Sequence, residues 1–215
     1  MGNAPAGPEV ATRLMPGHFE PIPGGGAAVA LDEVEISIIR SLAVQLLELI
    51  GPGEEPAGDD GDPLAELFAE GPSEPPADPV LKRLLPDAYG GPGSEGSLER
   101  ADELRAYSAE FRRFTENDLR ARKRDDALTV IRSLDALTVA GEGGAVLKLS
   151  ADDSRSWLGS LNDLRLAIGA RLDVTDEEDT DILYRLPDTD PRKPMVMAYL
   201  WLGGLQETLV ETLLP

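Results

Sequence analysis

The sequence contains no cysteine and a single histidine, His18, in 215 residues. Without cysteine the chain cannot form a disulfide, a zinc–thiolate site or a thiol-based redox switch of its own. A transition-metal site would have to use carboxylate ligands almost alone, and the acidic runs at 59–62 and 176–179 lack the spacing of a calcium-binding loop. No nucleophile has a His-based partner pattern. The sequence therefore predicts no metal, no cofactor and no catalytic residue, and we expect a protein that is not an enzyme.

Long apolar stretches are equally scarce. The N-terminus lacks an apolar segment of signal-peptide length, and the lack of disulfides fits a cytoplasmic protein. The longest apolar run, 194–215, is interrupted by Glu207 and Glu211, whereas a membrane-spanning helix needs about 20 mostly apolar residues. We expect a buried C-terminal helix in a cytoplasmic protein with no membrane partner.

Basic residues are few: the chain has 20 Lys and Arg against 40 Asp and Glu, a formal net charge of -20. A field of this sign repels phosphate backbones and anionic membranes at long range. Direct contact with nucleic acid is therefore disfavoured, and a basic partner surface is favoured. Six of the 20 basic residues nevertheless lie close together, namely Arg112, Arg113, Arg120, Arg122, Lys123 and Arg124.

Three interpretations of this basic segment stay open. Glu116 lies four residues before Arg120, and Asp118 four before Arg122, which is the favourable order for helical ion pairs of about 0.2–0.5 kcal/mol each. The segment can therefore be a solvated and internally paired helix face. It can also dock an acidic or polar surface of a protein partner, which is the interpretation we take forward. Direct DNA contact would favour an unpaired stripe of cations.

Apolar residues at helical spacing, by contrast, recur along much of the chain. Residues 1–16, rich in small residues and proline, predict a disordered tail. Residues 17–215 predict a single mainly helical domain with a flexible acidic Pro/Gly-rich loop at 51–77. Asp32 and Glu35 form a capping-box pattern before a long apolar-periodic segment. We expect a mainly α fold: one bundle of about five long helices with a small N-terminal β-hairpin.

Two segments offset by 118 residues share one pattern. Each reads as a glycine turn, a short strand and a capped helix that reaches a glycine. The matching pairs are Gly26 and Gly144, Leu31 and Leu149, Glu35 and Asp153, and Gly51 and Gly169. The two strands can pair as a minimal sheet against the helices. Alternatively, the match reflects only the sequence pattern that strand-to-helix units generally share.

The segment 97–137 predicts the longest helical region. Its N-terminal part carries one apolar stripe at helical spacing, made of Leu104, Tyr107, Phe111 and Phe114. Thr115 with Asp118 could cap a second helix, which would place a kink near residue 115.

A second suggestive segment is "LNDLRLAIGARLDV", in which Asn162, Asp163 and Arg165 lie among apolar residues. Their placement predicts a buried polar network tied to an arginine such as Arg113. The alternative is a concave pocket with convergent polar groups, which would indicate a small-ligand binder or an uncharacterised enzyme.

Four segments together resemble a known family: "DPVLKRLLPDAY", "EFRRFTENDLRARK", "LNDLRLAIGARLDV" and "YLWLGGLQETLVETLL". With the Gly-rich hairpin and the helix that bears Glu35, they are similar to the actinobacterial AosR-like family, catalogued as a domain of unknown function, number twenty-seventeen. The resemblance runs from Phe19 to Leu214. It implies an oxidative-stress transcription regulator that acts through a sigma-factor partner, encoded beside proteolytic and sulfur-pathway proteins.

The resemblance has one feature that does not carry over, because redox control through a cysteine pair is impossible in this chain. We expect a non-enzymatic cytoplasmic regulatory or adaptor protein, a stress-response transcription regulator. Its expected partner is a sigma factor or RNA polymerase, or else proteolytic or sulfur-pathway proteins. A direct DNA-binding regulator and an enzyme or small-ligand binder are the alternatives.

Overall fold

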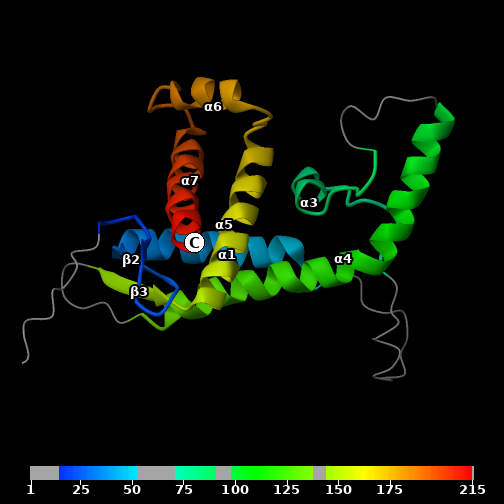
Figure 1. Ribbon diagram of the computed structural model, residues 1–215. Coiled ribbons are helices and arrows are strands. Elements are labelled where there is room, and N and C mark those ends of the chain that lie inside the picture. The colour runs from blue at the N-terminus through cyan, green and yellow to red at the C-terminus, as the bar shows by residue number, and fades with distance from the viewer. Residues whose placement is uncertain (1–14, 53–70, 91–97, 138–143, 215) are drawn as a thin grey trace, which may run out of the picture.

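The computed structural model describes residues 15–52, 71–90, 98–137 and 144–214. Residues 1–14 of the predicted tail and 53–70 of the predicted loop lie outside these described residues. The elements follow in the order β1 (Glu20–Pro21), β2 (Ala27–Leu31), α1 (Glu33–Ile50), α3 (Pro79–Leu84), α4 (Leu98–Asp135), β3 (Ala145–Leu149), α5 (Ala151–Arg171), α6 (Glu177–Tyr184) and α7 (Lys193–Leu213). Helices dominate, with a small sheet beside them (Figure 1), which confirms the mainly α fold class.

The sheet is antiparallel in the order β1-β2-β3. The predicted N-terminal hairpin is confirmed: β1 and β2 pair across a turn that contains Gly24 and Gly25, both with positive φ. β1 lies at an edge, where Pro21 needs no amide donor for a second neighbour. β2 is almost wholly buried in the middle of the sheet.

The two segments with a shared pattern pair their strands, as one of the two interpretations predicted. β2 and β3 pair antiparallel along their whole lengths. Gly26 and Gly144 occupy equivalent places, with φ of +97° and +90°. A Cβ at Gly26 would lie 2.1 Å from the carbonyl oxygen of Leu149, and one at Gly144 would lie 2.2 Å from that of Leu31. Only glycine fits at either position.

Local capping signals set the helix starts. The amide of Glu35 donates to Asp32 Oδ1 at 2.7 Å, and the amide of Asp32 donates to Glu35 Oε2 at 2.8 Å, which confirms the predicted capping box of α1. Ser150 and Asp153 form the equivalent box at the start of α5. Asp78 caps α3, with Pro79 at its first helical position.

The core lies where α5 packs against α4, α7 and α3. Trp157 of α5 is fully buried; its ring meets that of Phe19 edge-on at 6.0 Å, and its Nε1 donates to Ser133 Oγ at 2.9 Å. Trp201 of α7 is half-buried against the same core, so the predicted C-terminal helix packs as expected. Within the described ranges, no helix combines the length and the apolar content needed to cross a membrane.

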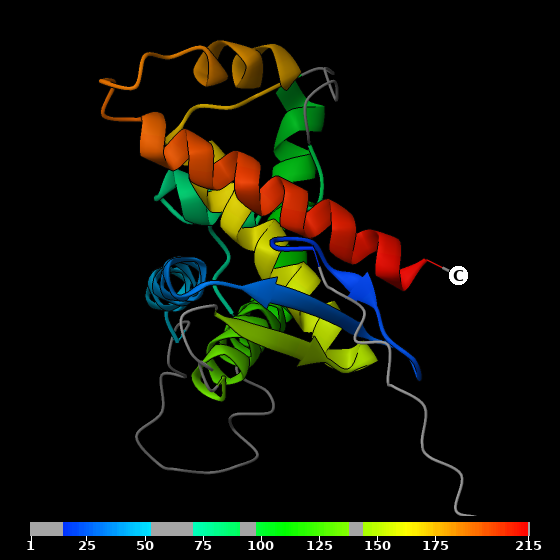
Figure 2. The same ribbon diagram turned by 90° about the vertical axis from the view of Figure 1, so that its left-hand side faces the viewer.

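The long helix α4 is continuous over 38 residues. No second helix starts near residue 115, because the Thr115 hydroxyl donates to the carbonyl of Phe111 at 2.8 Å instead of capping a new turn. Such bonds to the preceding turn bend helices without breaking them, and α4 is bent in Figure 1. Its C-terminal half packs under α1 and α5, while its N-terminal half turns away from them (Figures 1 and 2).

Candidate docking surface on the long helix

The basic residues of α4 do not share one exposed face. The side chain of Arg112 is only 4% exposed, that of Arg120 13% and that of Lys123 14%. These three residues therefore do not form an exposed docking surface. Sequence reasoning placed them on the solvated side because it had no information about what packs over the helix.

The other three basic residues are more accessible. Arg122 is exposed, whereas Arg113 and Arg124 are half-buried. The guanidinium of Arg113 lies 5.7 Å from the centre of the Phe114 ring, within the range of a cation–π contact. Arg122 is thus the most solvent-exposed of the six basic residues.

Arg112, Glu116 and Arg120 form a buried ladder of charges along α4. Arg112 pairs with the Glu116 carboxylate, and its Nη2 donates to the Leu85 carbonyl at 3.0 Å and to Asp87 Oδ1 at 2.9 Å. Arg120 Nε donates to Glu116 Oε1 at 2.9 Å, so this predicted ion pair forms, although inside the protein. Burial lowers the pKa of Arg112, but the bonds to Asp87 and Glu116 outweigh burial and raise it. The guanidinium therefore stays charged and ties the segment after α3 to α4.

Arg120 and Arg124 also close the C-terminal end of α1. Arg120 Nη1 donates to the carbonyl of Ile50 at 2.5 Å, and Arg124 Nη1 donates to that of Leu47 at 3.3 Å. The last carbonyls of a helix lack intrahelical donors and carry partial negative charge. The last turn of α1 has no basic residue of its own, so α4 supplies the charge. This explains part of the basic segment without any partner.

Lys123 binds the carboxylate of Asp163 on α5 at 2.6 Å, and the Asp163 side chain is 3% exposed. Burial raises the pKa of Asp163, while the bond to Lys123 acts in the opposite direction. Asn162 contributes a small effect that lowers the pKa of the same carboxyl, but Arg165 donates to Gln206 on α7 instead. The structure therefore joins Asp163 to Lys123 and leaves Arg165 outside the pair. Arg113, the partner that the sequence suggested, is not the one that binds it.

The N-terminal half of α4 also exposes aromatic side chains. Tyr107, Phe111 and Phe114 are 57%, 48% and 63% exposed, and Tyr89 from the segment after α3 is 47% exposed. The Tyr89 ring meets the rings of Tyr107 and Phe111 edge-on, at 6.3 and 6.2 Å. We call these four residues the aromatic face. Sequence reasoning found the stripe on α4 and missed that it faces solvent.

The aromatic face is held in place from behind. The amide of Tyr89 donates to Ser108 Oγ at 3.0 Å, and that hydroxyl donates to the Tyr89 carbonyl at 3.0 Å. Together with the bonds of Arg112, these contacts fix the segment after α3 on the helix. The rings therefore stand on a braced support, and an ordered support lowers the entropy lost on docking.

Candidate chemistry of other kinds is scarce in the part of the chain that the structure describes. There, no group of three or more His, Cys, Asp or Glu side chains gathers as a metal site. His18 lies in the exposed segment before β1, where its ring contacts the Pro16 carbonyl at 3.3 Å.

Comparisons with known proteins place these features in a family. Residues 16–213 match the family model described as Domain of unknown function (DUF2017). A relative from Mycobacterium tuberculosis (strain ATCC 25618 / H37Rv), named Oxidative stress regulator AosR, is 28% identical over 183 residues, which cover 84% of this chain and 78% of the relative. A relative from Mycobacterium leprae (strain TN), which also carries the AosR name, is 30% identical over 187 residues, covering 84% of this chain and 79% of the relative. No solved structure matches. Because the family model spans nearly the whole chain, which confirms the resemblance seen in the sequence, the chain belongs to the DUF2017 family.

Proposed function

We propose that this protein is a non-enzymatic, cytoplasmic regulator of the oxidative stress response, and that it acts by docking a protein partner on the aromatic face. The names of its relatives as oxidative stress regulators support the regulatory role. The observation that carries the docking is the exposure of four braced aromatic rings, 47–63% accessible. Clustered exposed apolar side chains mark interaction sites, and aromatic residues dominate the binding energy of interfaces.

The proposed partner belongs to the transcription machinery, as a sigma factor or another RNA polymerase component. This choice follows the family resemblance, and the net charge of -20 favours a partner whose surface is basic. The proteolytic and sulfur-pathway proteins remain the alternative partners. Arg122, which is exposed on α4, is the basic residue of the segment best placed to contact an acidic group within the partner's otherwise basic surface.

Direct DNA binding is the weaker proposal. Phosphate contacts need available cations, but Arg112, Arg120 and Lys123 are engaged by carboxylates inside the protein. Arg124 also donates to the end of α1. A DNA-binding function would leave a complex whose affinity falls steeply with salt, and we expect none with the purified chain.

Affinity capture from the protein's own cell lysate, with nuclease and at moderate salt, tests this function. The test variant carries Phe111→Ser and Phe114→Ser. The matched control carries Ile182→Ser and Tyr184→Ser, two substitutions of exposed apolar residues on α6 that are 63% and 58% accessible. Arg122→Glu serves as the charge variant, because reversing Lys123 as well would break its bond to Asp163.

We expect the wild type and the control to recover a sigma factor or RNA polymerase subunits, and the aromatic variant to lose them. Arg122→Glu should weaken recovery without abolishing it. Equal recovery by the aromatic variant and the wild type would overturn docking on this face. Recovery of proteolytic or sulfur-pathway proteins, lost in the same variant, would keep the docking surface and change the partner.

A further inference from the structure

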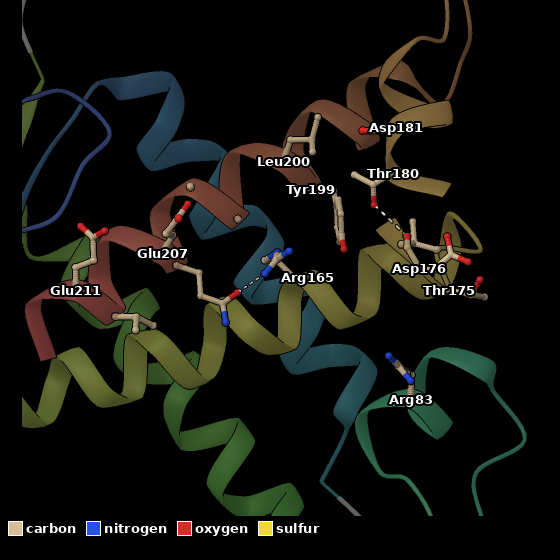
Figure 3. Close-up of a pocket in the computed structure, with 15 residues that line it drawn as sticks. Arg83, Arg165, Thr175, Asp176, Thr180, Asp181, Tyr199, Leu200, Glu207 and Glu211 are labelled. Atoms are coloured by element: carbon tan, nitrogen blue, oxygen red, sulfur yellow. Dashed lines mark hydrogen bonds between the residues drawn. The ribbon is translucent and has the colours of Figure 1, made fainter. Parts of the chain in front are cut away.

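A concave space lies between α3, α5, α6 and α7 (Figure 3). It has an outer groove of about 930 Å³ and a smaller adjoining recess of about 150 Å³, called here the inner cavity, which is open to solvent at Arg83 and Asn162. Both parts are lined by Arg83, Arg165, Val174 and Tyr199, so they adjoin one another. Ligand sites for small molecules are concave spaces of this size that are bordered by several elements.

The inner cavity has a local charge opposite to that of the whole chain. Its polar side chains are Arg83, Asn162, Arg165 and Tyr199, and no carboxylate lines it. Neither arginine makes an ion pair within the described residues. In a chain with 40 acidic and 20 basic residues, two such guanidinium groups bordering one small cavity favour an anionic ligand.

Arg165 is held in a fixed orientation at the centre of this space. Its guanidinium carbon lies 5.1 Å from the centre of the Tyr199 ring, and its Nη1 donates to Gln206 Oε1 at 2.7 Å. The guanidinium lies against α7 at Gly203, where a Cβ would lie 3.4 Å from Arg165 Nε. The Nε group is buried and has no hydrogen-bond acceptor. The guanidinium is thus preorganised by neighbours that are not its counter-ions, as suits recognition of an oxyanion.

The outer groove limits the charge that a ligand can carry. Its lining includes Asp176 just before α6, Asp181 on α6, and Glu207 and Glu211 on α7 (Figure 3). Like charges disfavour one another strongly where solvent is partly excluded. A nucleic acid, a nucleoside triphosphate or a tricarboxylate would be repelled by this rim, whereas a molecule with one oxyanion group would not.

We propose that this space is a binding site for a small molecule that carries a single oxyanion, either a carboxylate or a phosphate monoester. Arg83 and Arg165 bind the oxyanion, the amide of Asn162 donates to it, and the body of the molecule lies in the outer groove. The site is independent of the aromatic face. If the protein is a regulator as proposed above, the molecule bound at this site is the ligand to which the regulator responds.

Thermal unfolding of the full chain in low-salt buffer tests the site. The probes are acetate, pyruvate, glycine and L-serine as single carboxylates, glycerol 3-phosphate as a phosphate monoester, and citrate and ATP as multiply charged comparators. A specific probe should raise the Tm by roughly 5–10 °C at about 100 times its Kd. The carboxylate and phosphate arms separate the two sources of the oxyanion, and titration calorimetry then gives the affinity of the best probe.

Two variants keep the test decisive. Arg165→Gln should abolish the Tm shift. Arg83→Gln, at an exposed side chain on α3, should weaken binding at least tenfold and covers the case in which the first variant is unstable. Arg171→Gln, an exposed arginine on α5 outside this space, should leave the shift unchanged. The proposal is wrong if no single-oxyanion probe raises the Tm, if the shift survives in both test variants, or if citrate and ATP bind more tightly than the single oxyanions.

Discussion

The two halves of α4 differ in what they bury: the C-terminal half follows the usual relation between polarity and burial, and the N-terminal half reverses it. In the C-terminal half the buried side chains are apolar, with Ala127, Val130 and Leu134 at most 3% exposed. In the N-terminal half the buried side chains include Arg112 and Glu116, at 5% and 3%, while the aromatic rings face solvent. The difference follows from what each half meets. The C-terminal half packs on α1 and α5, whereas the N-terminal half meets a short segment that offers it a carbonyl and a carboxylate.

This comparison separates stability from function along one helix. Buried polar groups and large exposed apolar patches are the informative exceptions to the general rule of burial. Charges inside and rings outside give the N-terminal half little hydrophobic stabilisation. We therefore propose that its exposed rings serve docking and that the buried ladder holds them in place.

The largest effect is expected from breaking the buried ladder. Glu116→Ala leaves Arg112 and Arg120 without their shared carboxylate, and removal of one partner from a buried ion pair costs about 3–5 kcal/mol. Urea denaturation measures this loss. Asp118→Ala, an exposed acidic position two residues away, should change the free energy of unfolding by less than about 0.5 kcal/mol. Equal losses in the two variants would show that the ladder does not brace the helix.

In the C-terminal half of α4, whose buried side chains are apolar, a loss of stability is expected from creating a cavity. Leu134→Ala removes a side chain that is 3% exposed in the core cluster, and such changes cost about 2–5 kcal/mol. The same denaturation experiment measures it. A loss below 1 kcal/mol, on the order of a surface substitution, would mean that the C-terminal half of α4 is less tightly packed than the comparison requires.

The pair that joins α4 to α5 predicts a dependence on pH. The pKa of Asp163 is raised by burial, so its carboxyl holds a proton more tightly in the folded than in the unfolded chain. Stability from this group is therefore lost as pH rises from the unfolded pKa of about 3.9 through the higher folded value. The free energy of unfolding of the wild type, minus that of Asp163→Asn, should fall over this range.

Urea melts at several pH values measure this difference. Asp126, whose pKa is also raised by burial, is present in both proteins and does not enter the difference at first order. A difference that rises with pH would contradict the prediction. It would show that the attraction of Lys123 for the ionised carboxylate outweighs the effect of burial.

The smallest effect on stability is expected at the aromatic face. Phe114→Ala truncates a ring that is 63% exposed, and we expect a change within about 0.5 kcal/mol because little contact area is lost. Comparison with Leu134→Ala in the same melts sharpens the contrast between the halves. A loss as large as that of Leu134→Ala would show that the ring is part of the packed structure and not a docking residue.

The sequence predicts this structure best where the signals are local. The capping box at Asp32 and Glu35, the glycine turn before β2 and the strand before α5 depend on neighbouring residues, and all form. The burial of Arg112 and the bond between Lys123 and Asp163 join residues 25 to 40 positions apart. A helical stripe of rings has the same spacing whether it faces a core or solvent, so periodicity alone could not assign its side.

Local sequence patterns could not predict the concave space with its two arginines either. Asn162 and Arg165 were recognisable as polar residues in an apolar segment, and a pocket with convergent polar groups was one alternative for that segment. Arg83 lies on α3, and nothing local relates it to α5. The space exists because α3 and α7 both pack on α5, which is a tertiary fact.

The most direct test of the central claim is photo-crosslinking in the living cell from the aromatic face. A photoreactive phenylalanine analogue replaces Phe114, and the control places it at Val146 on β3, which is 49% exposed. We expect a discrete adduct with a protein of the transcription machinery at position 114 and none at position 146. An adduct of the same strength at both positions, or none at 114, would contradict docking on this face.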